Sequence, residues 1–91
     1  MSLIVAHAFN GTVLPTELKK YTNIDIGGIG PINVVKLFID NNNKNLKDLQ
    51  SATDVLLKDG YQIIYKIGDV AGYLKRNVPY YNTDRIVFQK K

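Results

Sequence analysis

The chain has 91 residues, a formal net charge of +4, no cysteine and no tryptophan, and its single histidine is His7. This length predicts one domain, residues 1–91, because two domains would each be too small to offset chain entropy without disulfides or metals. The missing residue types exclude disulfides and cysteine nucleophiles and favour a protein that binds over one that catalyses. We therefore expect no enzymatic activity and no cofactor.

The N-terminal segment predicts a strand, a turn and a second short strand. Residues 3–9 are rich in Ile, Val, Ala and Phe, which indicates a buried strand. Asn10-Gly11 favours a tight hairpin turn into a strand at 12–14, and Pro15 ends that strand. Residues 16–20 then have room for one helical turn.

The next segment alternates and then becomes continuously apolar. Residues 21–26 alternate apolar with polar side chains, as half-buried strands do. The glycines of Gly27–Gly30 break regular structure, but their spacing matches no phosphate-binding motif, so a tight turn is favoured over a ligand site. For residues 32–39, Pro31 favours the start of a helix, whereas the β-branched residues favour a buried strand. The strand is the preferred alternative.

The clearest helix spans residues 46–58. Asn45 can cap its first turn, and Gly60 can end it in a left-handed conformation. The helical spacing of its apolar residues predicts one buried stripe. That stripe comprises Leu46, Leu49, Ala52, Val55, Leu56 and Leu57.

The C-terminal third predicts a strand at 61–67, a shorter helix at 70–77 that Pro79 ends, and a final strand at 85–89. Together the elements indicate an α+β fold: a mostly antiparallel sheet of five or six strands, with the main helix packed across one face.

Few residues in the chain carry chemistry. His7 is the natural candidate for a general base, but it lies between two alanines of an apolar strand, where a hydrogen-bonded structural role is more common. The acidic residues are dispersed and match no calcium-binding or two-carboxylate pattern, so no metal site is predicted.

Two short segments resemble known families. Residues 65–74 are similar to the opening of a MerR-type helix-turn-helix, but Pro79 intervenes where the turn and recognition helix should follow. Residues 3–15 resemble the first strand of the small ring nucleases of archaeal viruses. Those enzymes depend on a Gly-His pair at the start of a central helix, and Gly28-Ile29-Gly30-Pro31 here contains no histidine. The resemblance therefore does not carry over the activity.

The function expected from these features is structural. Strands 3–9 and 85–89 are expected to expose sheet edges that pair with another protein or another copy, in a homo- or hetero-oligomer. The abundance of Asn, Ile, Lys and Tyr is typical of an AT-rich genome, so the concrete hypothesis is a small phage or virus particle component: a capsid-associated, connector or tail protein. The expected interface residues are Phe9, Tyr80, Tyr81, Arg85, Ile86 and Phe88.

The alternative function is nucleic-acid association through the basic, tyrosine-rich C-terminal third. Ten lysines against two arginines argue against base-specific reading, which favours arginine. No signal peptide and no membrane span are predicted, so the expected location is the virion or the cytoplasm. The candidate residues are Lys75, Arg76, Arg85, Lys90 and Lys91.

Overall fold

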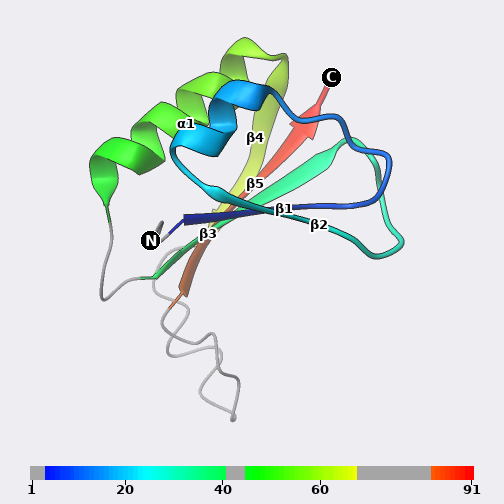
Figure 1. Ribbon diagram of the computed structural model, residues 1–91, viewed down its shortest axis with the longest axis horizontal. Coiled ribbons are helices and arrows are strands. Elements are labelled where there is room, and N and C mark those ends of the chain that lie inside the picture. The colour runs from blue at the N-terminus through cyan, green and yellow to red at the C-terminus, as the bar shows by residue number, and fades with distance from the viewer. Residues whose placement is uncertain (1–3, 41–44, 68–82) are drawn as a thin grey trace, which may run out of the picture.

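The computed structural model describes residues 4–40, 45–67 and 83–91. These residues form a five-stranded sheet with a short 3₁₀ helix and a 13-residue α-helix on one side of it (Figure 1). The small α+β domain predicted from the sequence is confirmed. In chain order the elements are β1 (Ile4–Ala8), η1 (Thr16–Lys20), β2 (Asn23–Ile26), β3 (Val34–Asp40), α1 (Leu46–Lys58), β4 (Tyr61–Ile67) and β5 (Thr83–Lys90).

The strands lie in the order β2-β1-β3-β5-β4. The pairs β1–β3, β3–β5 and β4–β5 are antiparallel, whereas β1 and β2 are parallel, so the sheet is mostly antiparallel as predicted. The expectation that strands 3–9 and 85–89 expose free edges is wrong. Both β1 and β5 have a hydrogen-bonded strand on each side, and the sheet edges are β2 and β4.

The turn at Asn10-Gly11 forms, but the predicted hairpin does not. Gly11 has a φ of 92°, and the Thr12 amide donates to the carbonyl of Phe9 at 3.0 Å. Residues 12–14 are not a strand. The chain instead passes through η1, whose Leu18 is fully buried, and returns as β2 parallel to β1. Burial of Leu18 in the core explains why the chain crosses above the sheet rather than folding straight back.

Residues 32–39 adopt the preferred strand, which begins at Val34. This strand, β3, pairs with β1 on one side and β5 on the other, so its backbone is hydrogen-bonded along both edges. Its side chains alternate: Val35, Leu37 and Ile39 are buried beneath α1, while Lys36 and Phe38 point to the opposite face.

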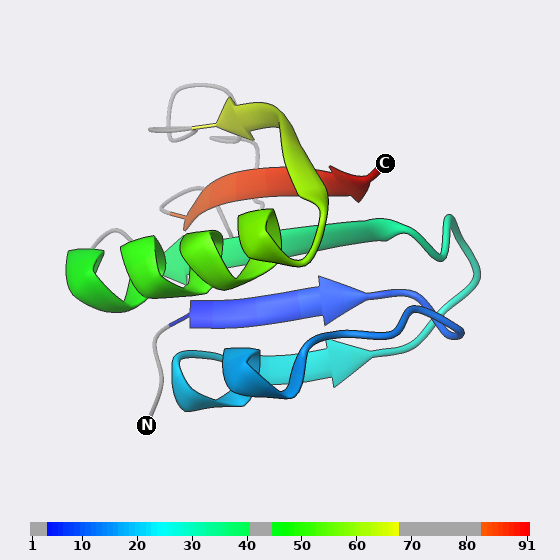
Figure 2. The same ribbon diagram turned by 90° about the horizontal axis from the view of Figure 1, so that it is seen from above.

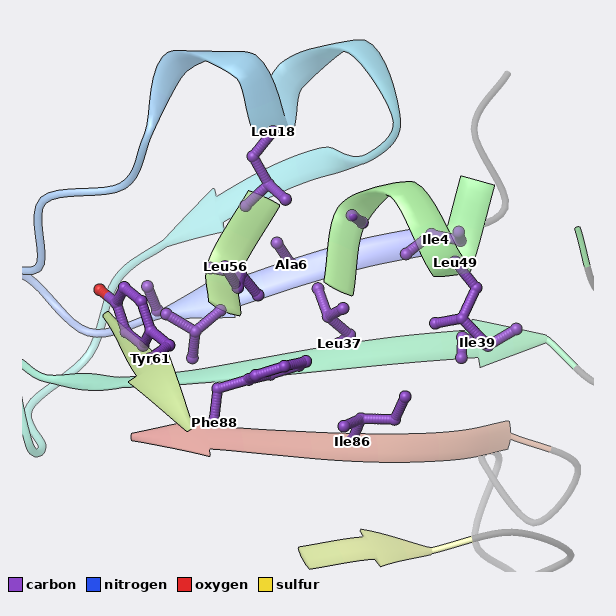
Figure 3. Packing of buried hydrophobic residues seen from close by; sticks show 13 residues of the cluster. Ile4, Ala6, Leu18, Leu37, Ile39, Leu49, Leu56, Tyr61, Ile86 and Phe88 are labelled. Atoms are coloured by element: carbon purple, nitrogen blue, oxygen red, sulfur yellow. The ribbon is translucent and has the colours of Figure 1, made fainter. Parts of the chain in front are cut away.

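The hydrophobic core lies between the sheet and the two helices (Figures 2 and 3). Its cross-strand rows follow the register, in which Ala6 is opposite Leu37 and Leu37 is opposite Ile86. Leu18, Leu56 and Phe88 point into the same space from η1, α1 and β5 (Figure 3). The buried cluster comprises Ile4, Ala6, Ala8, Leu18, Val35, Leu37, Ile39, Leu49, Ala52, Leu56, Tyr61, Ile86 and Phe88.

The main helix has the predicted boundaries. The Asn45 side-chain oxygen accepts a hydrogen bond from the amide of Asp48 at 3.1 Å, and Gly60 follows the helix with a φ of 96°. Leu49, Ala52 and Leu56 are buried as predicted, and Val55 is half-buried beside them.

Two members of the predicted stripe face solvent instead. Leu46 is 59% exposed and Leu57 is 44% exposed. A helix turns by about 100° per residue, so Leu57 lies to one side of Leu56 and cannot share its contact with the sheet. The stripe that packs on the sheet is narrower than the apolar pattern suggested.

The helix predicted at 70–77 lies outside the described residues, as do Lys75, Arg76, Tyr80 and Tyr81. Within the described part of the chain, no helix is long and apolar enough to cross a membrane.

Replacing Leu56 by alanine should lower the free energy of unfolding by about 2–5 kcal/mol, because the fully buried side chain leaves a cavity between α1 and the sheet. The same change at its neighbour Leu57 is the matched control and should cost about 1 kcal/mol or less. Urea denaturation of both variants measures the difference. Equal losses would contradict the assigned helix orientation.

Stability at high pH should depend on Tyr61. Burial raises the pKa of the Tyr61 phenol, and the nearby Asp59 carboxylate raises it further. The folded state therefore keeps a proton that the unfolded chain releases, so this contribution is present below about pH 10 and is lost as the pH rises through the folded-state pKa. The free energy of unfolding should fall less steeply above about pH 10 in Tyr61→Phe than in the wild type. Identical slopes in alkaline urea titrations would refute the assignment.

Candidate functional site

The candidate site is the face of the sheet that points away from α1, which we call the open face. Strand alternation places every second side chain there, and no helix among the described residues covers it. Most of its side chains are half-buried, but Val87 is only 2% exposed, so the accessible part lies over β1, β2 and β3 with Arg85 at its border. On β1 with the residue that follows it, and on β2, β3 and β5, the described side chains of the open face are those of Val5, His7, Phe9, Asn23, Asp25, Val34, Lys36, Phe38, Arg85, Val87 and Gln89.

His7 and Asp25 form a pair on this face. They are opposite each other in the parallel β1–β2 ladder, and His7 Nδ1 lies 3.2 Å from Asp25 Oδ2. The His7 ring also meets the Phe9 ring edge to face, with 5.4 Å between centroids. His7 points away from the face of β1 on which Ala6 and Ala8 are buried. Because the Asp25 side chain is 71% exposed, water screens the pair and it adds little to stability.

Two cations lie over aromatic rings on the open face. The guanidinium of Arg85 lies 4.8 Å from the centroid of Phe38, its direct cross-strand neighbour. The ammonium of Lys36 lies 5.7 Å from the centroid of Phe9. Such cation–π contacts hold the charged ends of the two side chains against the sheet. The open face therefore presents two aromatic rings and two positive charges side by side.

The loop Gly27–Gly30 packs against Phe9. A β-carbon at Gly30 would lie 2.6 Å from the nearest atoms of the Phe9 ring, and Gly28 has a φ of 78°. Glycine at position 30 is therefore required by the close approach of an aromatic ring. The expected break in regular structure is present, with Gly28 at a positive φ. The close approach involves the Phe9 side chain and not a second backbone.

A second exposed surface lies at the end of the sheet where β1 and β2 finish and β3 begins (Figure 2). A β-carbon at Gly11 would lie 3.2 Å from the Ile32 side chain, so the loops after β1 and before β3 are in contact. We call this surface the apolar tip. It consists of Val13, 81% exposed; Ile26, 48%; Ile29, 104%; and Ile32, 59%.

The four predicted interface residues that the structure describes fall into two groups. Phe9 and Arg85 lie on the open face, where a partner can reach them. Ile86 and Phe88 are 3% and 0% exposed and point into the core, so neither can anchor a partner while the protein stays folded. Their strand was expected at an edge, but the pairing of β5 with both β3 and β4 places it inside the sheet.

Of the predicted nucleic-acid residues, the structure describes Arg85, Lys90 and Lys91, and it does not bring these three together. Arg85 lies on the open face, whereas Lys90 lies on the helix side, 3.5 Å from the Asp59 carboxylate and over the Tyr61 ring. Lys91 is exposed, and its amide donates to the carbonyl of Gly60 at 3.2 Å. The C-terminus is thus held by its own chain, and of the three described residues of this set only Arg85 lies on the candidate surface.

Sequence reasoning missed Lys36, Phe38 and Asp25. Lys36 and Phe38 belong to a segment that was interpreted as continuously apolar, although a lysine in its middle is the signal of alternation. Reading residues 34–39 with a period of two would have placed Lys36 and Phe38 on one face. Predicting the pairing of Asp25 with His7 would have needed the parallel register of β1 and β2, and no local sequence pattern indicates that register.

Comparison with protein-family models, with curated proteins and with solved structures finds no match to this chain. Across residues 4–40, 45–67 and 83–91, no cluster of three or more His, Asp or Glu side chains is placed to hold a metal ion. The site is therefore defined by its geometry alone: an aromatic and cationic sheet face beside an apolar tip.

Gly30→Ala should push the Phe9 ring out of its position beside the glycine loop, because the added β-carbon and the ring cannot occupy the same space. Gly27→Ala is the matched control, since a β-carbon there meets no atom within 4 Å. We expect a loss of about 1 kcal/mol or more at position 30 and shifted NMR signals from the Phe9 and His7 rings. Unchanged ring signals in Gly30→Ala would rule out the close approach.

Proposed function

We propose that this protein is a non-catalytic structural protein that assembles through protein–protein contacts at the apolar tip. The observation that supports the proposal is the exposure of Val13, Ile26, Ile29 and Ile32 at one end of the sheet. Single exposed apolar residues are ordinary, but four of them in the loops at one end of a sheet favour an interaction surface.

The composition of the tip favours the same role. The loops that carry it, residues 9–15 and 26–33, contain no charged residue, although 22% of the chain is charged. Depletion of charge is characteristic of the centre of protein–protein interfaces. The Phe9 ring packs against Gly30 and the Ile32 side chain packs against Gly11, so these loops are held together by their own contacts. A preformed apolar surface loses little entropy when it binds.

The occupant that we propose is a second copy of this chain. An uncharged apolar patch is complementary to itself, and most soluble oligomers use the same patch on both subunits. Such an assembly fits a role as a component of a larger particle. We propose that this particle is that of a phage or virus, in which the chain is a capsid-associated, connector or tail protein. The support for this part of the proposal is the amino-acid composition, which is typical of an AT-rich genome.

The proposal predicts concentration-dependent self-association that single charges at the tip abolish. Ile29→Glu and Ile32→Glu should each raise the dissociation constant at least about 10-fold, because a carboxylate would be buried in an apolar contact. Leu46→Glu is the control, since it makes the same change at a residue that is 59% exposed in the first turn of α1. Sedimentation equilibrium measures all three.

A wild-type chain that stays monomeric at about 100 μM, where association with a micromolar dissociation constant would be nearly complete, contradicts self-association. An oligomer that Leu46→Glu weakens as much as Ile29→Glu would show that another surface forms the contact.

A further inference from the structure

We propose that the open face binds single-stranded nucleic acid, with bases stacking on its aromatic–cation pairs and phosphates contacting Lys36 and Arg85. This inference is independent of the assembly proposed at the apolar tip, because it uses different residues. It also differs from the binding site expected in the C-terminal third, of which it retains only Arg85.

The first argument is the arrangement of two stacking platforms. Arg85 lies over Phe38 at 4.8 Å, and Lys36 lies over Phe9 at 5.7 Å. The register places Phe38 on β3 opposite Val5 on β1, and Phe9 follows Val5 by four residues. Normal strand spacings therefore separate the backbones of Phe9 and Phe38 by about 14 Å. Aromatic side chains and arginine guanidinium planes are both surfaces on which unpaired bases stack.

The second argument is charge. The described side chains of the open face include Lys36 and Arg85 as fixed cations and Asp25 as the only carboxylate. That carboxylate lies beside His7 at the β2 edge, 3.2 Å from the imidazole, and not beside either cation. The contacts that the structure describes for the two cations are with the rings of Phe9 and Phe38, and a cation over an aromatic ring keeps the charge that attracts a phosphate.

The third argument is shape. β1 and β3 are neighbours inside the sheet, Phe38 lies on β3 and Phe9 directly follows the last residue of β1, so neither ring belongs to an edge strand. Stacking requires base faces that are free, and a duplex has already stacked its bases on one another. The open face therefore suits a single strand. Stacking on aromatic rings and contacts from lysine and arginine to phosphates do not depend on which base is present, so we expect binding without sequence preference.

Binding can be measured by fluorescence anisotropy with a labelled oligothymidylate of about 12 nucleotides, a length within the range of known single-strand sites. We expect the affinity to fall as salt rises from about 50 to 200 mM, because phosphate contacts release counterions. A duplex of the same length should bind more weakly than the single strand.

Three substitutions locate the site. Lys36→Ala should weaken binding several-fold, whereas Lys47→Ala, which removes the same charge from the exposed surface of α1, should have little effect. Phe38→Leu keeps an apolar side chain in the sheet but removes the stacking surface, and should weaken binding by about 5- to 150-fold, the range for one base–aromatic stack. Arg85→Lys keeps the charge and should weaken binding while leaving the salt dependence unchanged.

The proposal is overturned if the wild-type chain does not bind the oligonucleotide at about 50 mM salt. It is also overturned if Lys36→Ala and Lys47→Ala weaken binding equally, since binding would then follow net charge and not the open face. Retention of full affinity in both Phe38→Leu and Arg85→Lys, with native circular dichroism spectra, would exclude stacking. Preferential binding of the duplex would likewise contradict it.

Discussion

Burial of one face of the sheet beneath α1 and η1 is the interaction on which the rest of this structure depends. The three central strands, β1, β3 and β5, each contribute every second side chain to the core, and Leu56 and Leu18 close it from above. A domain of this size buries too little surface to tolerate a loose core, so the register of these strands is strongly specified. A shift by one residue would exchange Leu37 for Lys36 beneath the helix.

The same alternation creates the open face. Every residue that points into the core has neighbours that must point away from it, and on the central strands these neighbours include His7, Lys36, Phe38 and Arg85. Stability therefore constrains the residues that point into the core. It constrains the outward-pointing residues less, so these can differ without disrupting the core. Phe9 joins this face to the apolar tip, because its ring lies near Lys36 and His7 and also approaches Gly30.

The arrangement of the strands also explains where the protein can meet partners. The strands nearest the two ends of the chain lie inside the sheet, so they offer no free backbone for another strand. One edge is β2, which is only four residues long, and the other is β4, which carries an irregularity between Ile63 and Tyr65. Short strands and bulges are common protections of sheet edges against unwanted pairing. Side-chain surfaces are thus better suited to binding here than the strand edges.

The sequence by itself determined the elements whose signals are local: the cap at Asn45, the helix to Lys58, the left-handed Gly60 and the turn at Asn10-Gly11. It also indicated the strands and the α+β class, and it placed Phe9 and Arg85 among the candidate residues. Only the tertiary structure decided that β2 runs parallel to β1, that β5 lies inside the sheet, and that Phe38 meets Arg85. These features depend on which strands become neighbours in the sheet. Strand order is set by the burial of the whole core, which involves residues far apart in the sequence, so no short segment predicts it.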